Sequence, residues 1–298
     1  MPSKPPGGID AWWATPQLLV RGRQDSDAAS NRLEVRPRAL SPASCSVSFP
    51  SHLPRRFMTT PWVYSGKTVL ITGVARSGQI GHAVALAFGR AGAKIVAVDR
   101  NAVAVAERVR EFESEGIASR PAAGDLSEAD VAALAVETAL KHYGRLDAVI
   151  NVAGGLTTYG PVGQSGTADF DREIAINLKT AFLMSRAAIP ALAASRGKIV
   201  NFASVAYYRP AGQLAVYSAA KAGVAALTQS LAVELWPEGI RINAVAPGMV
   251  RTPENVATAG ASAHYVEMQQ ILDAVLFLAS DLSGGITGHI LPVTNGVL

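Results

Sequence analysis

The 298-residue sequence contains no uninterrupted apolar run of about 20 residues, the length that a helix needs to cross a bilayer. We therefore expect no membrane-spanning helix. Cysteine is almost missing: Cys45 is the single one, so no disulfide can form within one chain. This composition suits a reducing compartment, and we expect a cytoplasmic protein without a bound metal ion.

Most of the chain also has no net charge, although the formal net charge of the whole sequence is +4. Residues 1–57 hold eight of the 27 Lys and Arg residues and four of the 23 acidic ones. The remaining 58–298 then carry nineteen of each and are neutral. A nucleic-acid-binding protein concentrates basic residues on one face, so we expect no nucleic-acid partner.

Residues 1–57 differ in composition from the rest, because they hold eight of the seventeen prolines and no sustained hydrophobic period. Such a segment buries too little apolar surface to offset its ordering entropy. A disordered leader, or a translation start extended upstream of Met58, is the first interpretation. A transit peptide is favoured by Arg and Ser but weakened by the acids and prolines, and a functional arm is the third. We expect one domain over 58–298.

From residue 67 onward, short apolar runs alternate with helical patterns. Strands are predicted over 67–72, 94–98, 146–150, 198–202, 241–245 and 290–293. Helices are predicted over 80–91, 102–115, 128–143, 167–193 and 216–235, and a short segment leads to Asp125. Wholly apolar strands that alternate with helices indicate a parallel sheet covered on both faces. We therefore predict a doubly wound α/β (Rossmann) fold with its ligands at the carboxyl ends of the strands.

The first strand-to-helix turn contains Gly73, Gly78 and Gly81. Glycines allow a sharp turn and a close approach of the backbone to a pyrophosphate, which the amides of a helix N-terminus favour. Asp99 follows at the end of the second strand, where a carboxylate can bind ribose hydroxyls and repel a 2′-phosphate. We therefore expect NAD as the cofactor. NADP stays open, because Arg76 and Arg100 are residues that a 2′-phosphate would attract.

Tyr217 and Lys221 are spaced four residues apart on a predicted helix, so their side chains share one face. A phenol with its ordinary pKa of ~10 is a poor base at neutral pH, and a neighbouring ammonium should favour the phenolate. Ser204 comes thirteen residues before Tyr217, just past a strand, where its hydroxyl could hold a substrate oxygen. The ordered set indicates proton transfer beside a dinucleotide.

With these motifs the chain resembles the short-chain dehydrogenase/reductase family over nearly all of 64–298. The resemblance makes Tyr217, Lys221 and Ser204 catalytic, and adds Asn177 as the residue that holds a proton-relay water. It implies homotetramers or homodimers. It also implies the following cofactor-binding residues: Gly73, Arg76, Gly78, Gln79, Ile80, Gly81, Asp99, Asp125, Leu126, Asn151, Ala153, Gly154, Tyr217, Lys221, Pro247, Gly248, Val250 and Thr252.

Three features depart from the family pattern. The glycine turn is two residues longer than usual, and Gln79 stands where the family has its middle glycine. Val152 replaces the second Asn of an Asn-Asn-Ala-Gly motif. The segment from Thr252 to Ile271 is shorter than the expected substrate lid.

The resemblance implies hydride transfer between a nicotinamide cofactor and a secondary alcohol or ketone, with Tyr217 as general acid or base. Substrate contacts are expected from residues 155–156, 207–209 and 253–270. Among them, Arg209 with Tyr207 and Tyr208 suggests a ring or a carboxylate in the substrate. Two alternatives stay open. Enoyl reductases of the same superfamily have a longer glycine turn, although their Tyr and Lys are six residues apart. A non-catalytic dinucleotide-binding regulator could keep the fold without turnover.

Overall fold

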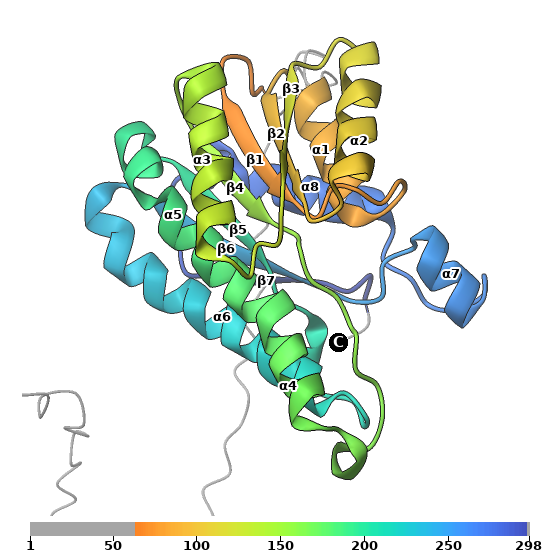
Figure 1. Cartoon of the computed structure of the whole chain (residues 1–298). Coiled ribbons are helices and arrows are strands. Elements are labelled where there is room, and N and C mark those ends of the chain that lie inside the picture. Colours follow the sequence, from red (N-terminus) through yellow and green to blue (C-terminus); the bar gives the residue numbers. More distant parts are fainter. Residues whose placement is uncertain (1–62, 297–298) are drawn as a thin grey trace, which may run out of the picture. The chain divides into compact units, whose positions relative to one another are not determined.

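A computed structural model describes residues 63–296 (Figure 1). The predicted leader over 1–57 lies outside the described residues. The strands are β1 Thr68–Thr72, β2 Lys94–Asp99, β3 Ser119–Ala123, β4 Ala148–Asn151, β5 Lys198–Phe202, β6 Arg241–Pro247 and β7 Ile290–Val293. The α-helices are α1 Ile80–Arg90, α2 Ala102–Ser114, α3 Ala129–Tyr143, α4 Thr167–Ile174, α5 Thr180–Ser195, α6 Ala215–Leu235, α7 Pro253–Ala259 and α8 Met268–Ala279. A π-helical turn, η4 (Ala175–Lys179), joins α4 to α5.

The strands form one parallel sheet in the order β3-β2-β1-β4-β5-β6-β7. The order reverses between β1 and β4, so the expected doubly wound fold is confirmed. Each residue of β1 is buried, as an apolar central strand requires. β3 was not among the predicted strands, because Pro121 and two exposed residues break the apolar pattern. Its place at the edge of the sheet tolerates a proline.

Helices cover both faces of the sheet (Figure 1), and a large hydrophobic core lies on each face. One core joins the sheet to α1, α2 and α8, with Phe88 and Phe112 fully buried. The other joins it to α3, α5 and α6, with Met184 and Leu192 fully buried. Parallel strands covered in this way end at one common edge, and that edge carries the side chains considered below.

The single predicted helix over 167–193 is wrong in detail, because the wider η4 turn divides it into α4 and α5. Periodicity does not detect one extra residue in a helical turn. Helices α7 and α8 were not predicted either. Helix α7 and the first turn of α8 occupy about half of the segment from Thr252 to Ile271, which is shorter than the expected substrate lid.

Candidate active site

The glycine turn after β1 is held by contacts that leave no room for side chains. Gly73 and Gly78 have φ of +75° and +72°, a conformation that L residues rarely adopt. A Cβ on Gly81 would lie 2.1 Å from the carbonyl oxygen of Gly73. Helix α1 begins at Ile80 after Gln79, whose side chain does not cap it. Because α1 begins just after the carboxyl end of β1, its first amides lie at the carboxyl edge of the sheet. The Gln79 side chain leaves them uncapped, as an anion site requires.

His82 holds the lengthened glycine turn in place by a hydrogen bond. Its Nδ1 accepts a 3.1 Å hydrogen bond from the backbone N–H of Gly78, and its Nε2 lies 3.0 Å from Glu111 Oε1. The imidazole is buried and stacks on Phe112 at 5.8 Å between ring centres. The sequence analysis missed this residue, although a polar side chain on the apolar face of α1 was a visible signal.

Asp99 ends β2 beside the turn. Its Oδ2 accepts a 3.0 Å hydrogen bond from the N–H of Ala75, and its Oδ1 accepts a 3.1 Å bond from the N–H of Asn101. Arg76 points away from this carboxylate, to an ion pair 2.7 Å from Glu254 on α7. The structure thus gives Arg76 an acidic partner, while Asp99 lies at the end of β2 with backbone N–H groups bound to both carboxylate oxygens.

Asp125 and Leu126 follow β3 at the same edge. Asp125 Oδ1 accepts a 2.8 Å hydrogen bond from the N–H of Ser127, which is the main cause of a lowered pKa of the Asp125 carboxyl. Leu126 is buried in the core beside α3.

A buried polar network lies under the end of β4. The amide of Asn151 donates to Asn201 Oδ1 at 2.8 Å, and the amide of Asn201 donates to Thr228 Oγ1 at 2.9 Å. The chain therefore retains polar links between β4, β5 and α6, although Val152 lacks the side-chain amide of the Asn that it replaces. Ala153 donates its N–H to Thr72 Oγ1 at 2.9 Å, and a Cβ on Gly154 would lie 2.5 Å from Asn177 Oδ1.

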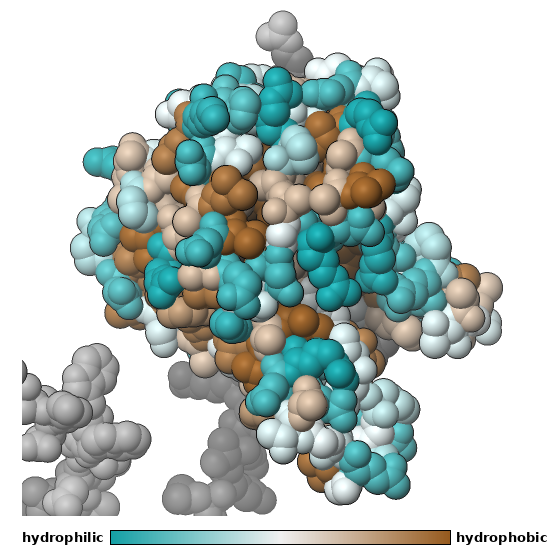
Figure 2. Space-filling view, in the orientation of Figure 1, coloured by the Kyte–Doolittle hydropathy of each residue, from teal (hydrophilic) through white to brown (hydrophobic). Residues whose placement is uncertain are grey.

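The residues after β6 complete the edge. Gly248 follows Pro247 and donates its N–H to Val293 of β7 at 2.9 Å. Val250 is buried, and Thr252 caps α7 by accepting a 3.2 Å hydrogen bond from the N–H of Asn255. Helix α7 projects from the body of the molecule, and the surface is hollowed between it and the lobe that contains α4 (Figures 1 and 2).

Three of the four predicted catalytic side chains, those of Tyr217, Lys221 and Ser204, converge. Tyr217 and Lys221 lie one turn apart on α6, and Lys221 Nζ is 5.8 Å from the centre of the Tyr217 ring. Lys221 is buried and donates a 2.8 Å hydrogen bond to the carbonyl oxygen of Phe202, the last residue of β5. Ser204, two residues later, accepts a 3.2 Å bond from the N–H of Ala206 and hydrogen-bonds Tyr217.

Burial dominates the electrostatics of this group. It raises the pKa of Tyr217, which the hydrogen bond to Ser204 lowers in part and the negative charge of Glu173 raises further. A neighbouring ammonium was expected to favour the phenolate, but the net effect in this structure is a raised pKa of Tyr217. Burial lowers the pKa of Lys221 from 10.5 to about 8, against the opposing effect of Glu173. Both groups are thus perturbed, which is common at functional sites.

Asn177 lies in the η4 turn and is buried. Its amide donates to the carbonyl oxygens of Gly155 and Glu173 at 3.0 and 3.1 Å, and its Oδ1 accepts a 3.0 Å bond from the N–H of Gly155. Wide π turns inside α-helices occur frequently at functional sites. Glu173, which is fully buried, was missed by the sequence analysis because a Glu within a polar helix reads as a solvent-facing residue.

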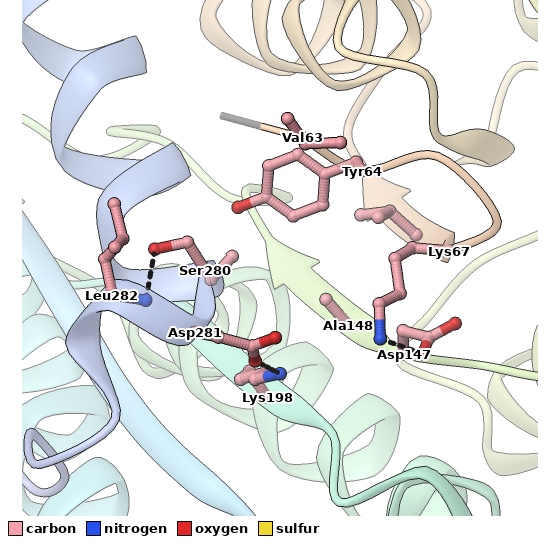
Figure 3. A pocket seen from close by; sticks show the side chains of 11 residues that line it. Val63, Tyr64, Lys67, Asp147, Ala148, Lys198, Ser280, Asp281 and Leu282 are labelled. Carbon is pink, nitrogen blue, oxygen red and sulfur yellow. Dashed lines mark hydrogen bonds and ion pairs between the residues drawn. The ribbon is translucent and has the colours of Figure 1, made fainter. Parts of the chain in front are cut away.

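The cavity shown in Figure 3 lies away from these residues, at the amino edge of the sheet. It has a volume of about 170 Å³ and lies between Tyr64 of the first loop and the segment after α8. Its charged residues are already paired: Lys67 with Asp147 at 3.5 Å, and Lys198 with Asp281 at 2.5 Å. Since the charges compensate one another, we assign this cavity no part in the chemistry.

Residues 63–296 include no helix that is both long and apolar enough to cross a membrane. Over the same residues, His, Cys, Asp and Glu form no group of three or more that could hold a metal ion.

Comparisons with known proteins place the chain among oxidoreductases. A family model described as "Enoyl-(Acyl carrier protein) reductase" matches residues 73–298. The chain is 36% identical over 241 residues to a (2S)-[(R)-hydroxy(phenyl)methyl]succinyl-CoA dehydrogenase subunit of Thauera aromatica, with 77% of this chain and 96% of that protein covered. It is 36% identical over 244 residues to trans-4-hydroxycyclohexanecarboxylate dehydrogenase of Sinomonas cyclohexanicum, with 77% and 92% covered.

Among solved structures, a short-chain type dehydrogenase/reductase from Mycobacterium ulcerans superimposes with a TM-score of 0.74 at 28% identity. The alignment covers 78% of this chain and 90% of that one.

Proposed function

Since this chain belongs to the short-chain dehydrogenase/reductase family, whose enzymes act on CH–OH groups, we propose that Tyr217 is its general acid–base residue. The convergence of Ser204, Tyr217 and Lys221 at the carboxyl edge carries this proposal. The enzyme transfers a hydride between a nicotinamide cofactor and a secondary alcohol or ketone. When bound, the nicotinamide ring supplies the redox step.

The residues at the edge fit such a cofactor. Side chains are excluded at Gly73, Gly81 and Gly154, which leaves backbone for a pyrophosphate to approach. Asp99 stands where the adenosine ribose hydroxyls would bind, and this carboxylate would repel a 2′-phosphate. We therefore propose NAD, held by the residues of the glycine turn, by Asp99 and Asp125, and by the segments after β4 and β6.

In the direction of oxidation, the Tyr217 phenolate takes the proton of the substrate hydroxyl. The Ser204 hydroxyl holds the substrate oxygen and stabilises the charge that develops on it. The Lys221 ammonium favours the phenolate, which must form against the burial that raises its pKa. Asn177 and Lys221 connect the phenol to bulk water for return of the proton.

For the substrate, we propose a secondary alcohol that carries a ring or a carboxylate. Tyr207 and Tyr208 pack edge to face at 4.9 Å between ring centres, next to the exposed Arg209. This group could bind an apolar ring and an anionic end. The two relatives named above support the idea, because their names describe hydroxyl compounds with a ring and an acid or thioester group.

NAD-coupled oxidation of a panel of secondary alcohols tests the function, with ring-bearing and carboxylate-bearing members beside simple alkanols. We expect reduced nicotinamide to form, fastest with the ring-bearing acids. Failure across the panel, and with the matching ketones and NADH, would refute it. Enoyl reduction is the second candidate, since the glycine turn is long and the matching family model carries that description. Reduction of an enoyl thioester without reduction of ketones would favour it.

Two broader proposals follow from the family. We propose a homotetramer or homodimer, supported by exposed apolar side chains such as Val233 and Trp236, which are 78% and 52% exposed. Sedimentation of the purified chain as a monomer would contradict it. We propose a cytoplasmic location, which imaging of the tagged full chain would test.

A further inference from the structure

Glu173 is unusual among the described residues because its carboxylate is fully buried without a cation in contact. The other buried carboxylate, Asp147, forms ion pairs with Arg145 and Lys67. Glu173 instead accepts hydrogen bonds from neutral groups: the N–H of Thr157 at 3.1 Å, the hydroxyl of Thr157, and the amide of Asn177 at 3.2 Å. A buried charge is costly unless something compensates it.

Lys221 is, conversely, a buried cation that no carboxylate of the described residues contacts. Its buried ammonium contacts the neutral carbonyl of Phe202, and within 63–296 it forms no salt bridge. Helix α4, which carries Glu173, packs against α6, which carries Lys221. The two buried charges therefore lie on helices that pack together, and the charge of Glu173 acts on Lys221. Charge interactions are strong when little water lies between the groups.

Resting on the proposed function, we propose that Glu173 is a positioning residue: it fastens the loop of residues 155–157 to Asn177 and acts as the counter-charge of Lys221. The first part follows from geometry, since Asn177 and Thr157 both bind Glu173 while Asn177 also binds both backbone polar groups of Gly155. One carboxylate thereby joins the loop after β4 to the η4 turn.

Other titratable and charged groups lie on the elements around Glu173 and Lys221. From α6, Tyr217 and Lys221 sense the charge of Glu173, which raises the pKa of both. On its own helix, Asp169 pairs with Arg172 and Asp171 is exposed. On the short 3-10 helix η5 (Val205–Tyr207), Tyr207 interacts with Tyr208. Removing the charge of Glu173 should therefore lower the pKa of both Tyr217 and Lys221.

The test compares Glu173→Gln, which removes the charge and keeps the shape, with Asp171→Asn, which makes the same change on an exposed position of the same helix. In the pH profile of kcat for alcohol oxidation, the ascending limb should move to lower pH in E173Q and stay at the wild-type pH in D171N. Thr157→Val keeps the charge and loosens the loop, so it should raise KM without moving the limb. An E173Q limb at the wild-type pH would overturn the counter-charge role.

A second measurement does not need turnover. Free energies of unfolding are measured for the wild type, E173Q, Lys221→Met and the double variant. E173Q should destabilise the protein more when Lys221 is present than when Met replaces it, because only then is a buried charge left without its partner. Additive effects would overturn the proposal. If E173Q does not fold, Glu173→Met replaces it in the same cycle. If the wild type shows no turnover at all, the proposed function fails, while this cycle still decides the pairing.

Discussion

The carboxylate of Asp99 accepts a 3.0 Å hydrogen bond from the backbone N–H of Ala75, which ties the end of β2 to the glycine turn. A 2′-phosphate placed at this point would meet a fixed negative charge. NADH should therefore bind more tightly than NADPH, and Asp99→Ala should narrow the difference. Fluorescence titration of each cofactor measures both affinities, and tighter NADPH binding by the wild type would reverse the assignment.

Arg76 serves as the control for this prediction. Because Glu254 pairs with it at 2.7 Å, Arg76→Ala should leave the ratio of the two affinities nearly unchanged. A selective loss of NADPH binding in this variant would mean that Arg76 leaves Glu254 to bind the phosphate.

Gly81→Ala should destabilise the protein, because its Cβ would lie 2.1 Å from the Gly73 carbonyl oxygen. The clash is with backbone, so β1 and α1 must separate, at a cost of about 1–3 kcal/mol or more. Gly285→Ala is the matched control, since a Cβ there meets nothing within 4 Å. Urea denaturation gives both free energies, and equal stability of the two variants would disprove the tight contact.

Lys221→Met should abolish activity and should change how the stability of the fold depends on pH. Burial lowers the Lys221 pKa to about 8, so the folded protein holds this proton less tightly than the unfolded chain does. Removing the ammonium relieves that penalty, but it leaves the Phe202 carbonyl without its donor and the Glu173 carboxylate without its counter-charge.

The same difference predicts a pH dependence. Between pH 8 and 10.5 the unfolded chain keeps a proton that folded Lys221 has released, so this residue's contribution makes the protein more stable as pH rises. The stability of Lys221→Met relative to the wild type should therefore be highest below pH 8 and should fall above it. Thermal melts of both proteins from pH 6 to 10 measure it. A constant difference would contradict the lowered pKa.

A chain that begins at Met58 should keep the melting temperature and cofactor affinity of the full chain, because both described cores lie within 63–296. Tyr64, by contrast, is needed for the stability of the fold. It packs edge to face on Phe88 at 4.8 Å and donates a 2.6 Å hydrogen bond to the carbonyl of Leu276. Tyr64→Ala in the shortened chain should cost about 3–5 kcal/mol. Loss of folding on starting at Met58 would show that the leader is structural.

Much of the fold could be predicted because β1, β2, β4, β5 and β6 are nearly continuous apolar runs, which only a sheet covered on both faces buries. The edge strand β3 could not, since Arg120 and Pro121 give it no such pattern. The π turn at Asn177 could not be predicted either. It depends on one extra residue within a helix, and hydrophobic periodicity hardly changes.

The candidate site could likewise be predicted only in part. Tyr217, Lys221 and Ser204 form an ordered motif, and their convergence follows from the α6 helix and the end of β5. His82 and Glu173 act through tertiary contacts, with Gly78 and Glu111 in one case and with Thr157 and Asn177 in the other. Sequence spacing contains no sign of those partners. The raised pKa of Tyr217 was missed for the same reason, because burial is a property of the folded site.

The most direct test of the proposed mechanism is the turnover of Tyr217→Phe with a substrate that the wild type oxidises. The phenylalanine ring can keep the packing of Tyr217 on α6 but has no proton to exchange. We predict a loss of kcat on the order of 10² to 10⁴, the range for general acid–base groups, with NADH affinity nearly unchanged. A variant that keeps most of the wild-type kcat would show that the proton is transferred by another group, and would contradict the assignment of Tyr217.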